Sequence, residues 1–413
     1  MERQPLAPPL AMATAVSMWA VGYLGRLPGV EAPSPFLGVA FLVLYFLGGW
    51  VAGKVMGGGF WSGAKVGALT SLVNLLILGS LLGEGRLSPW VFIPGALLSG
   101  ALMAGLGGVW ARPAATQLDG AGLLARTAVV ATFLLVVAGG LVTSHGAGLA
   151  VPDWPNTYGT NMFLFPLSRM TGGVYYEHAH RLFGSLVGLT TLALAVYLTV
   201  VAHPRRLSRL AWGIFFLVVV QGVLGGLRVT GTLTFSQDPQ HLKPVVELAV
   251  VHGVLGQVVL AGLVALAVLL TGRWTAFASR SQLAPRWLVA LLLLQLVVGA
   301  WQRHLAEGLL FHISLASLVV LLAAWVGWQV WMERDWPLRS LGRWLVLVAC
   351  GQFLLGFAAL WTRGYPPAER GLEPLEVWVT TAHQAGGALL LSLAVAVASL
   401  TWPKWLAYFG VRR

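Results

Sequence analysis

The chain has 413 residues, of which 57% are hydrophobic and only 10% are charged. This is too little polar surface for a soluble protein, so we expect an all-α integral membrane protein whose apolar segments are helices. The net charge of +12 comes from Lys and Arg in short loops between apolar runs, which fits the positive-inside rule and argues against nucleic-acid binding.

The first part of the chain contains four apolar segments of about 20 residues, the length that crosses a bilayer. They lie near 6–24, 36–53, 63–83 and 90–110. No basic stretch precedes the first segment, so we expect no cleaved signal peptide. The connection "ARPAATQLDGAGLLAR" (111–126) then brings Pro, Asp and two Arg. We therefore predict a separate four-helix membrane segment over residues 1–115, to which the sequence assigns no chemistry.

Eight further apolar segments follow, near 124–144, 173–202, 210–230, 244–271, 287–303, 308–331, 344–362 and 375–401. The loops between them are alternately basic and mixed, and the basic ones include "HPRRLSR" (203–209) and "ERDWPLRSLGR" (333–343). Because basic loops stay in the cytoplasm, both termini are predicted to be cytoplasmic.

These eight segments carry an internal repeat. Gln221 and His252 are 31 residues apart, and so are Gln352 and His383. His180 precedes His252 by 72 residues, while His312 precedes His383 by 71. We therefore predict an eight-helix core of two pseudo-symmetric four-helix bundles, one over 120–271 and one over 285–405.

Each predicted bundle contributes one histidine from its second helix and one from its fourth, roughly 10–12 Å inside the helix at about 1.5 Å per residue. Ionisable groups at this depth are usually functional. Two imidazoles that face each other across a bundle can bind haem iron from both sides, so we predict the pairs His180–His252 and His312–His383. Hydrogen bonding to a neighbouring helix is the structural alternative. A zinc or copper site would need a third ligand that the repeat does not supply.

The stretch "VYYEHAHRLF" (174–183) adds polar groups beside the first histidine. Glu177 is one turn from His180 on the same helix face, so it is a candidate acid or base, or else the partner of Arg181 in a salt bridge. Arg181, Arg228 and Arg363 fall near outer helix ends. They are candidates to bind haem propionates or, alternatively, to reach lipid phosphates.

The loop "TSHGAGLAVPDWPNTYG" (143–159) together with "EHAHR" (177–181) closely resembles the haem A synthase family, the CtaA/Cox15 proteins. That family has a Pro-Asp-Trp-Pro outer loop, then a Glu-x-x-His-Arg helix, then three further haem-binding histidines. The resemblance covers roughly residues 120–405. It implies that His312 and His383 hold haem b as a prosthetic group, and that His180 and His252 face the substrate haem O.

By this resemblance the C8 methyl of haem O is oxidised to a formyl group, which gives haem A for terminal oxidases, with Glu177 handling protons beside that methyl. The expected location is the cell's inner membrane, with the haem sites toward the extracytoplasmic side. The expected partners are a haem O synthase, an electron-transfer protein and a second copy of the chain, although no residue identifies them. Many relatives have cysteines where this chain has Val151 and Thr157.

Two other functions remain open at this point. A b-type cytochrome would use both histidine pairs permanently for electron transfer. A haem carrier or transporter would move the porphyrin without changing it, and internal duplication is common among transporters.

Overall fold

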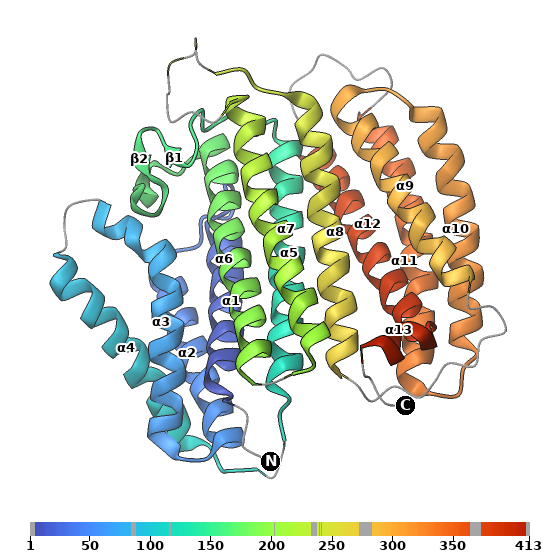
Figure 1. Ribbon diagram of the computed structural model, residues 1–413. Helices are drawn as coiled ribbons and strands as arrows, with labels where there is room; N and C mark the ends of the chain where they lie inside the picture. The colour runs from blue at the N-terminus through green and yellow to red at the C-terminus, as the bar shows by residue number, and fades with distance from the viewer. Residues whose placement is uncertain are drawn as a thin grey trace.

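The computed structural model of the chain describes residues 5–83, 88–114, 117–201, 203–232, 238, 240, 242–271, 283–363 and 373–409. These residues are almost entirely helical (Figure 1). The long helices are α1 (Ala7–Arg26), α2 (Ser34–Met56), α3 (Gly59–Gly83), α4 (Pro89–Trp110), α5 (Gly120–Ser144), α6 (Gly172–Val200), α7 (Arg205–Thr230), α8 (Val246–Thr271), α9 (Ala284–Leu305), α10 (Leu309–Trp331), α11 (Trp336–Arg363) and α12 (Pro374–Leu400). The short elements are β1 (Asn156–Thr157), β2 (Thr160–Asn161), the 3-10 turns η1 (Met162–Leu164) and η2 (Leu167–Arg169), and α13 (Pro403–Tyr408).

Local sequence signals explain where several helices begin and end. Six of the long helices, α1, α2, α4, α9, α11 and α12, have proline in one of their first two positions. Proline suits these positions because its missing N–H has no partner there in any helix. At the end of α7, Gly231 adopts the left-handed conformation with φ 70°, and its N–H bonds to the Leu227 carbonyl.

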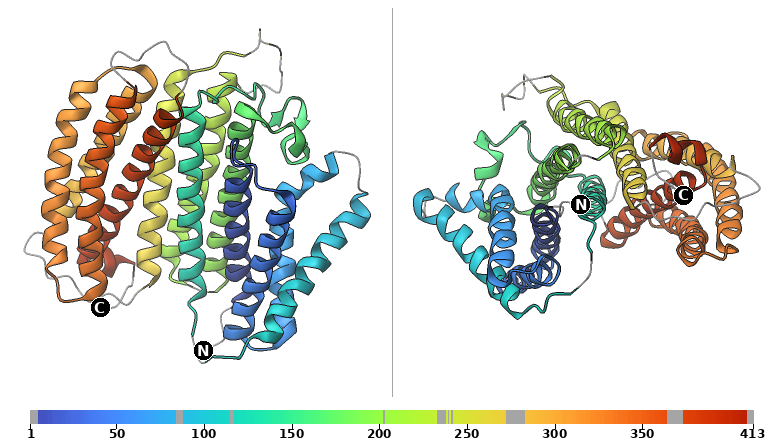
Figure 2. Two further views of the ribbon diagram at one scale, coloured as in Figure 1. Left: turned by 180° about the vertical axis from the view of Figure 1, so that it is seen from behind. Right: turned by 60° about the horizontal axis from the view of Figure 1, so that its bottom comes forward.

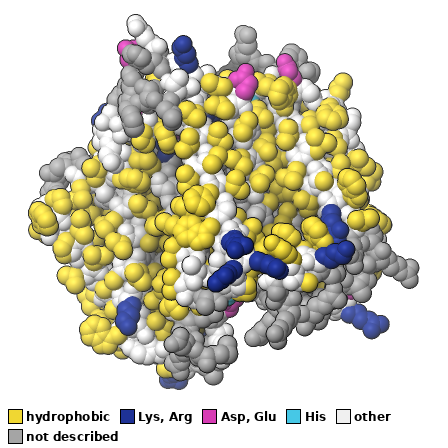
Figure 3. Space-filling model, in the orientation of Figure 1, with side chains coloured by type: hydrophobic (Ala, Val, Ile, Leu, Met, Phe, Trp, Pro, Cys, Tyr) yellow, Lys and Arg dark blue, Asp and Glu magenta, His cyan; other side chains and the backbone are white. Residues whose placement is uncertain are grey.

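Eleven of the described helices, α2 to α12, are long and apolar enough to cross a membrane, with 22 to 29 residues each. The prediction of an all-α, multi-pass membrane protein is therefore confirmed. Figure 3 shows a broad hydrophobic face, with most of the Lys and Arg in this view toward its lower end. Large side chains such as Leu310 and Trp361, each about four-fifths exposed, belong to the surface that lipid would cover.

The helices from α5 onward form two bundles side by side (Figures 1 and 2). In the N-terminal bundle, α5, α6, α7 and α8 pack in a ring, and in the C-terminal bundle α9, α10, α11 and α12 do the same. Helices α5 and α8 meet α12, and α8 also meets α9, so these helices form the seam between the bundles.

Each bundle has its own apolar core. Fully buried Leu186, Leu194 and Leu198 belong to the N-terminal core, and Leu288 and Leu345 belong to the C-terminal core. Because lipid tails are as apolar as leucine, such cores are held by close packing more than by escape from water.

The four N-terminal helices pack beside the N-terminal bundle, with α1 against α5 and α3 against α6 (Figure 2). Helices α2, α3 and α4 approach closely through glycine: a Cβ added at Gly49 or Gly67 would collide with the backbone of α4. Trp19 of α1 lies edge-on to Phe183 of α6, with ring centroids 5.5 Å apart. The N-terminal segment is thus docked on the bundle that contains His180.

Helix α13 was not among the predicted elements. Its Leu406, and Phe409 just after it, belong to the apolar core of the N-terminal bundle, although α13 follows the last helix of the C-terminal bundle. Arg206, at the start of α7, lies over the Tyr408 ring at 4.2 Å from its centroid. The described chain begins and ends at the same end of the helix array, the lower end in Figure 1.

Candidate functional site

The four histidines predicted from the repeat form two facing pairs. His180 of α6 and His252 of α8 have ring centroids 6.2 Å apart, with the ring planes at 75°. His312 of α10 and His383 of α12 have centroids 6.4 Å apart, with the planes at 84°. The two bundles therefore repeat the same arrangement at nearly the same spacing.

This spacing fits a metal ion held between the two rings. Bonds from imidazole nitrogen to a metal are about 2 Å long, and the ring centre lies about 1 Å behind that nitrogen, so opposed ligands have ring centres about 6 Å apart. Within the described residues, no group of three or more His, Cys, Asp or Glu is placed to hold a metal ion. The donor set is thus two imidazoles per site, the set that bis-histidine haem requires.

The histidines are not all equally far from the starts of their helices. His180 and His383 are the ninth and tenth residues of α6 and α12, and His252 is the seventh residue of α8. His312 is only the fourth residue of α10, so it lies nearer the start of its helix than the other three histidines do. A similar depth of all four in the membrane stays a prediction.

Each histidine ring packs against a glycine on the helix that precedes its own. A Cβ added to that glycine would lie 2.9 to 3.2 Å from the ring's Cε1 atom, which is closer than real Cβ contacts normally are. A larger residue would push the ring aside, so these glycines define the ring positions. The pairs are Gly139–His180, Gly225–His252, Gly299–His312 and Gly356–His383.

Two of the histidine rings have a further polar contact. His252 Nδ1 lies 3.2 Å from the Gln221 carbonyl, and His312 Nδ1 lies 3.0 Å from the side-chain nitrogen of Gln295, which donates. Because His252 Nδ1–H donates to a carbonyl, His252 presents its Nε2 lone pair to a metal. The described part of the chain shows no hydrogen bond to Nε2 of any of the four histidines.

The loop between α5 and α6 is folded rather than extended. Strands β1 and β2 pair through a two-residue turn in which Tyr158 and Gly159 both have positive φ, 49° and 72°. This is the pattern of a type I′ hairpin. Asp153, which is fully buried, accepts both turn amides, from Tyr158 and Gly159 at 2.8 Å each. The Trp154 ring lies against Gly226 of α7, next to the glycine that contacts His252.

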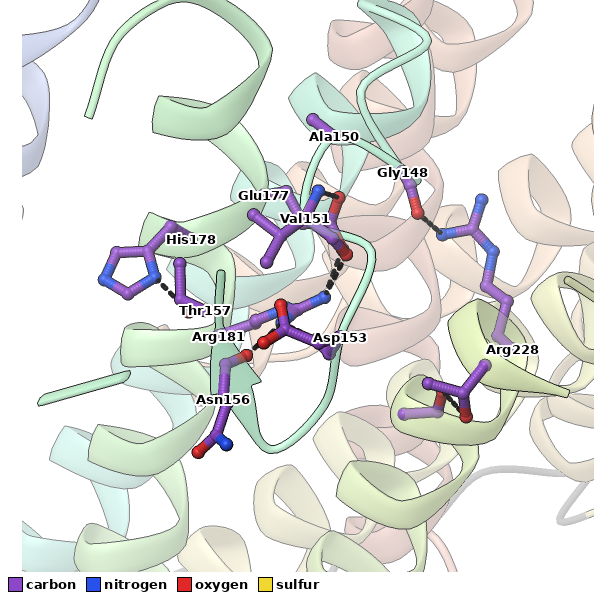
Figure 4. Close-up of polar contacts among 12 residues, drawn as sticks. Gly148, Ala150, Val151, Asp153, Asn156, Thr157, Glu177, His178, Arg181 and Arg228 are labelled. Carbon is purple, nitrogen blue, oxygen red and sulfur yellow. Dashed lines mark hydrogen bonds and ion pairs between the residues drawn. The ribbon is translucent and has the colours of Figure 1, made fainter. Parts of the chain in front are cut away.

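Glu177 and Arg181 attach this loop to α6 (Figure 4). Glu177 is 4% exposed; one oxygen pairs with Arg181 at 2.6 Å and the other accepts the Val151 N–H at 2.9 Å. Arg181 also donates to the carbonyls of Val151, Asp153 and Asn156. The salt bridge considered from the sequence is present, and a direct contact of Arg181 with a propionate stays a prediction.

The two loop positions where the resemblance led us to expect cysteine are buried here. Val151 offers its backbone to Glu177 and Arg181, and the Thr157 hydroxyl lies 3.0 Å from His178 Nδ1 (Figure 4). Both side chains have no exposed surface. Non-covalent contacts to α6 therefore hold this part of the loop.

The other two candidate arginines lie at the outer ends of α7 and α11. Arg228 donates to the Gly148 carbonyl at 3.1 Å (Figure 4). Arg228 also lies near His180 and His252. Arg363 is the last residue of α11 and lies near Arg303 of α9, where the two like charges repel. Propionate binding by Arg228 and Arg363 stays a prediction.

Sequence reasoning missed several residues around these sites. Arg303 donates to Ser144 of α5 at 3.1 Å, and Ser144 is bonded to Thr380 and Thr381 of α12, which makes a polar link across the seam. The polar run Gln302-Arg303-His304 at the end of an apolar helix could have indicated the polar link. The glycines that contact the histidine rings could also have been found, because each one ends a similar five-residue segment.

A comparison with known protein families finds a match within the eight-helix core. Residues 123–312 match the model of the cytochrome oxidase assembly protein family, COX15-CtaA. The chain is similar to this family over that range, which is just under half of its length. The match includes Glu177, His180 and His252 and ends at His312, so α1 to α4 and His383 lie outside it.

Three curated relatives carry the name haem A synthase. The protein of Symbiobacterium thermophilum is 38% identical over 108 residues, which is 26% of this chain and 33% of that relative. The protein of Parvibaculum lavamentivorans is 23% identical over 322 residues, 64% of this chain and 89% of the relative. The protein of Pelagibacter ubique is 27% identical over 165 residues, 39% of this chain and 46% of the relative. In these three matches the chain covers about a third, nine-tenths and just under half of the relative's own length, in that order.

Proposed function

We propose that this protein is a haem A synthase, which oxidises the C8 methyl of haem O to a formyl group. The observation that supports this most is the duplication of one arrangement: a facing histidine pair in each bundle, with rings 6.2 and 6.4 Å apart. Two haem sites in one chain suit an enzyme that keeps one haem and modifies another. The relatives named haem A synthase favour this reading over other two-haem proteins.

The two sites are assigned by their surroundings. His180 and His252 are proposed to take the substrate haem, because Glu177 and the outer loop adjoin this pair. His312 and His383 are proposed to hold haem b. When bound, haem b would supply one-electron redox chemistry. The chain's own contribution at that site is to orient the two imidazoles and to exclude water with an apolar bundle.

Glu177 is the proposed catalytic residue. It lies one turn outward from His180 on the same helix, and its carboxylate is held by Arg181 and the Val151 amide. A carboxylate fixed in this way points to one place, where it can accept a proton from a group beside the substrate ring. The contacts with Arg181 are also what hold the outer loop, so the two functions of Glu177 must be separated by experiment.

The arginines at the outer end are proposed to bind the carboxylate groups of the haems. Arg228 serves the N-terminal site, because it lies in the last turn of α7, near both histidines there. Arg363 serves the C-terminal site, while Arg181 is engaged by the loop and would contribute mainly through its charge.

The proposed location is the cell's inner membrane, with both termini cytoplasmic and the haem sites toward the outer face. In support, basic loops such as 203–209 and 333–343 lie at the end of the array where the described chain begins and ends. A haem O synthase and an electron-transfer protein are the proposed partners, since haem O is too apolar to travel freely through water.

Identification of the bound pigments tests this function. The protein would be co-expressed with a haem O synthase in a host that otherwise makes only haem B, then purified and its haems separated by chromatography. Haem A is expected together with haem B, and a His180→Ala variant should yield no haem A. Haem B alone, present in both sites, would instead identify a b-type cytochrome, and unchanged haem O passed across the membrane would identify a carrier.

A further inference from the structure

The helix before each histidine contains the same five-residue segment. Its last residue is the glycine that contacts the histidine ring, and its first residue lies one turn earlier. The four copies are "LVVAG" (135–139), "QGVLG" (221–225), "QLVVG" (295–299) and "QFLLG" (352–356). The repeat is therefore fourfold at the level of helix pairs, and one copy has leucine where the other three have glutamine.

The glutamine has a definite task in the three copies that contain it. Its side-chain nitrogen donates to the backbone carbonyl of the histidine, at 2.6 Å to His252, 3.0 Å to His312 and 2.9 Å to His383. A helix that receives such a bond is joined to its neighbour at the turn that carries the haem ligand. In a membrane interior this bond has no water to compete with it.

The first copy lacks this bond because Leu135 has no donor. Leu135 packs against the apolar core of the N-terminal bundle. The backbone of Leu135 lies beside the His180 ring. Nδ1 of His180, like Nδ1 of His383, has no hydrogen-bond partner in the described part of the chain, so the missing amide bond to the histidine carbonyl is what distinguishes the first copy. The nearest polar attachments of α6 are Arg181, the next residue along the chain, and Glu177, one turn further out, and both bind the outer loop and not the helix α5 that carries Leu135.

We propose that Leu135 makes His180 the exchangeable haem ligand of this protein. With no amide bond to its turn of helix, His180 can swing off the iron and return at less cost than the other three histidines. The bond that breaks is the coordination bond from His180 Nε2, which keeps its lone pair. This rests on the proposed function, in which the N-terminal site must admit haem O and release haem A while the C-terminal site keeps its haem.

Haem release from the purified protein tests the proposal. Both sites would be loaded with haem B in detergent, an excess of haem-free myoglobin added, and haem transfer followed by absorbance. Two phases are expected, and the faster one should be missing in His180→Ala. Leu135→Gln should slow the faster phase by roughly three- to tenfold, the equivalent of one interhelical hydrogen bond, and leave the slower phase unchanged.

Two further variants separate the hydrogen bond from packing and folding. Leu135→Met, similar in size but without a donor, should release haem as the unaltered protein does. Gln352→Leu removes only the bond to the His383 carbonyl, so it should accelerate only the slower phase, and it decides the matter if Leu135→Gln does not fold. A single phase in the unaltered protein, equal effects on both phases, or an unchanged slow phase in Gln352→Leu would overturn the proposal. Because haem B is not converted, failure of the haem A assay would leave this measurement intact.

Discussion

At the scale of single residues, the outer loop depends on a few buried charges. Near the start of α6, Glu177 pairs with Arg181 and accepts a loop amide. Arg181 donates to loop carbonyls, and Asp153 accepts amides of the hairpin turn. Charged groups in such surroundings are costly unless they are fully paired. Their pairing explains why a chain with few charges places three of them here.

The first prediction concerns Glu177. Glu177→Gln should reduce conversion of haem O by at least about 100-fold, the usual contribution of a general acid or base. Haem B bound by His312 and His383 should remain, because that pair lies in the other bundle. Chromatography of the extracted haems measures both quantities.

Arg181→Met is the matched control for loss of the contacts that attach the outer loop to α6. It removes the charge and the donors that fix the loop but leaves the Glu177 carboxylate. If proton handling is the main role of Glu177, Arg181→Met should convert haem O better than Glu177→Gln. Equal losses in both variants, or normal haem A production by Glu177→Gln, would contradict the assigned role.

The second prediction concerns Asp153. Asp153→Ala removes the buried carboxylate that accepts from the amides of Tyr158 and Gly159. The loss of these two charge-assisted hydrogen bonds should destabilise the hairpin by about 1–3 kcal/mol. Hydrogen exchange of these amides should become faster. Asn161→Ala, which removes one acceptor at an exposed position, should have a smaller effect; equal effects would contradict the role of Asp153.

At the scale of elements, the functional unit is a pair of neighbouring helices. The first helix contributes a glycine and the second contributes the histidine that packs on it. A glycine is needed because the imidazole occupies the space of its missing side chain. The same geometry appears four times, so substitutions can be compared between copies.

The third prediction uses two glycines of α7. Gly225→Leu should displace His252, since even a Cβ would lie 2.9 Å from its ring. Gly222→Leu is the control, because no atom lies within 4 Å of a Cβ at that position. The first variant should lose low-spin haem signals of the N-terminal site by electron paramagnetic resonance. Unchanged spectra in Gly225→Leu would show that the ring does not depend on this contact.

At the scale of the whole molecule, the two bundles are separate rings that share a seam. Each histidine pair lies within one bundle, and polar contacts such as Arg303 to Ser144 join the bundles at the outer end. A substitution in one histidine pair should therefore abolish haem binding at that pair and leave the other pair intact. The N-terminal helices should stabilise the N-terminal bundle, on which they are docked.

The fourth prediction follows from this separation. His312→Ala or His383→Ala should deplete haem B from the purified protein, whereas His252→Ala should retain it. Haem content per polypeptide, measured after extraction, gives the answer. Full retention of haem B in both C-terminal variants would mean that haem b belongs to the other pair.

The fifth prediction tests the docked N-terminal segment. Trp19 is 3% exposed, packs edge-on to Phe183 and donates to Asn74 at 3.1 Å. Trp19→Ala should lower the stability of the protein by about 3–5 kcal/mol, seen as earlier thermal unfolding in detergent. Trp90, which is 89% exposed, provides the control, and Trp90→Ala should have little effect. Similar unfolding of both variants would show that α1 contributes no packing energy.

Composition and hydropathy alone determined the class of the protein. Long apolar runs must become helices in lipid, because backbone groups there can pair only within the chain, so the twelve long helices were predicted from local information. The spacings Gln221–His252 and Gln352–His383, together with His180–His252 and His312–His383, were enough to single out the four histidines. The spacing of residues along the chain can be read from the sequence without knowledge of the tertiary structure.

Only the tertiary structure decided which groups meet. The bond from Gln295 to His312, the link from Arg303 to Ser144 and the packing of α13 on the other bundle join residues with no common period. The use of Arg181 by the outer loop depends on a hairpin whose direction no local pattern predicts. These contacts depend on how helices rotate and pack against one another, and that rotation is set by all of their side chains together.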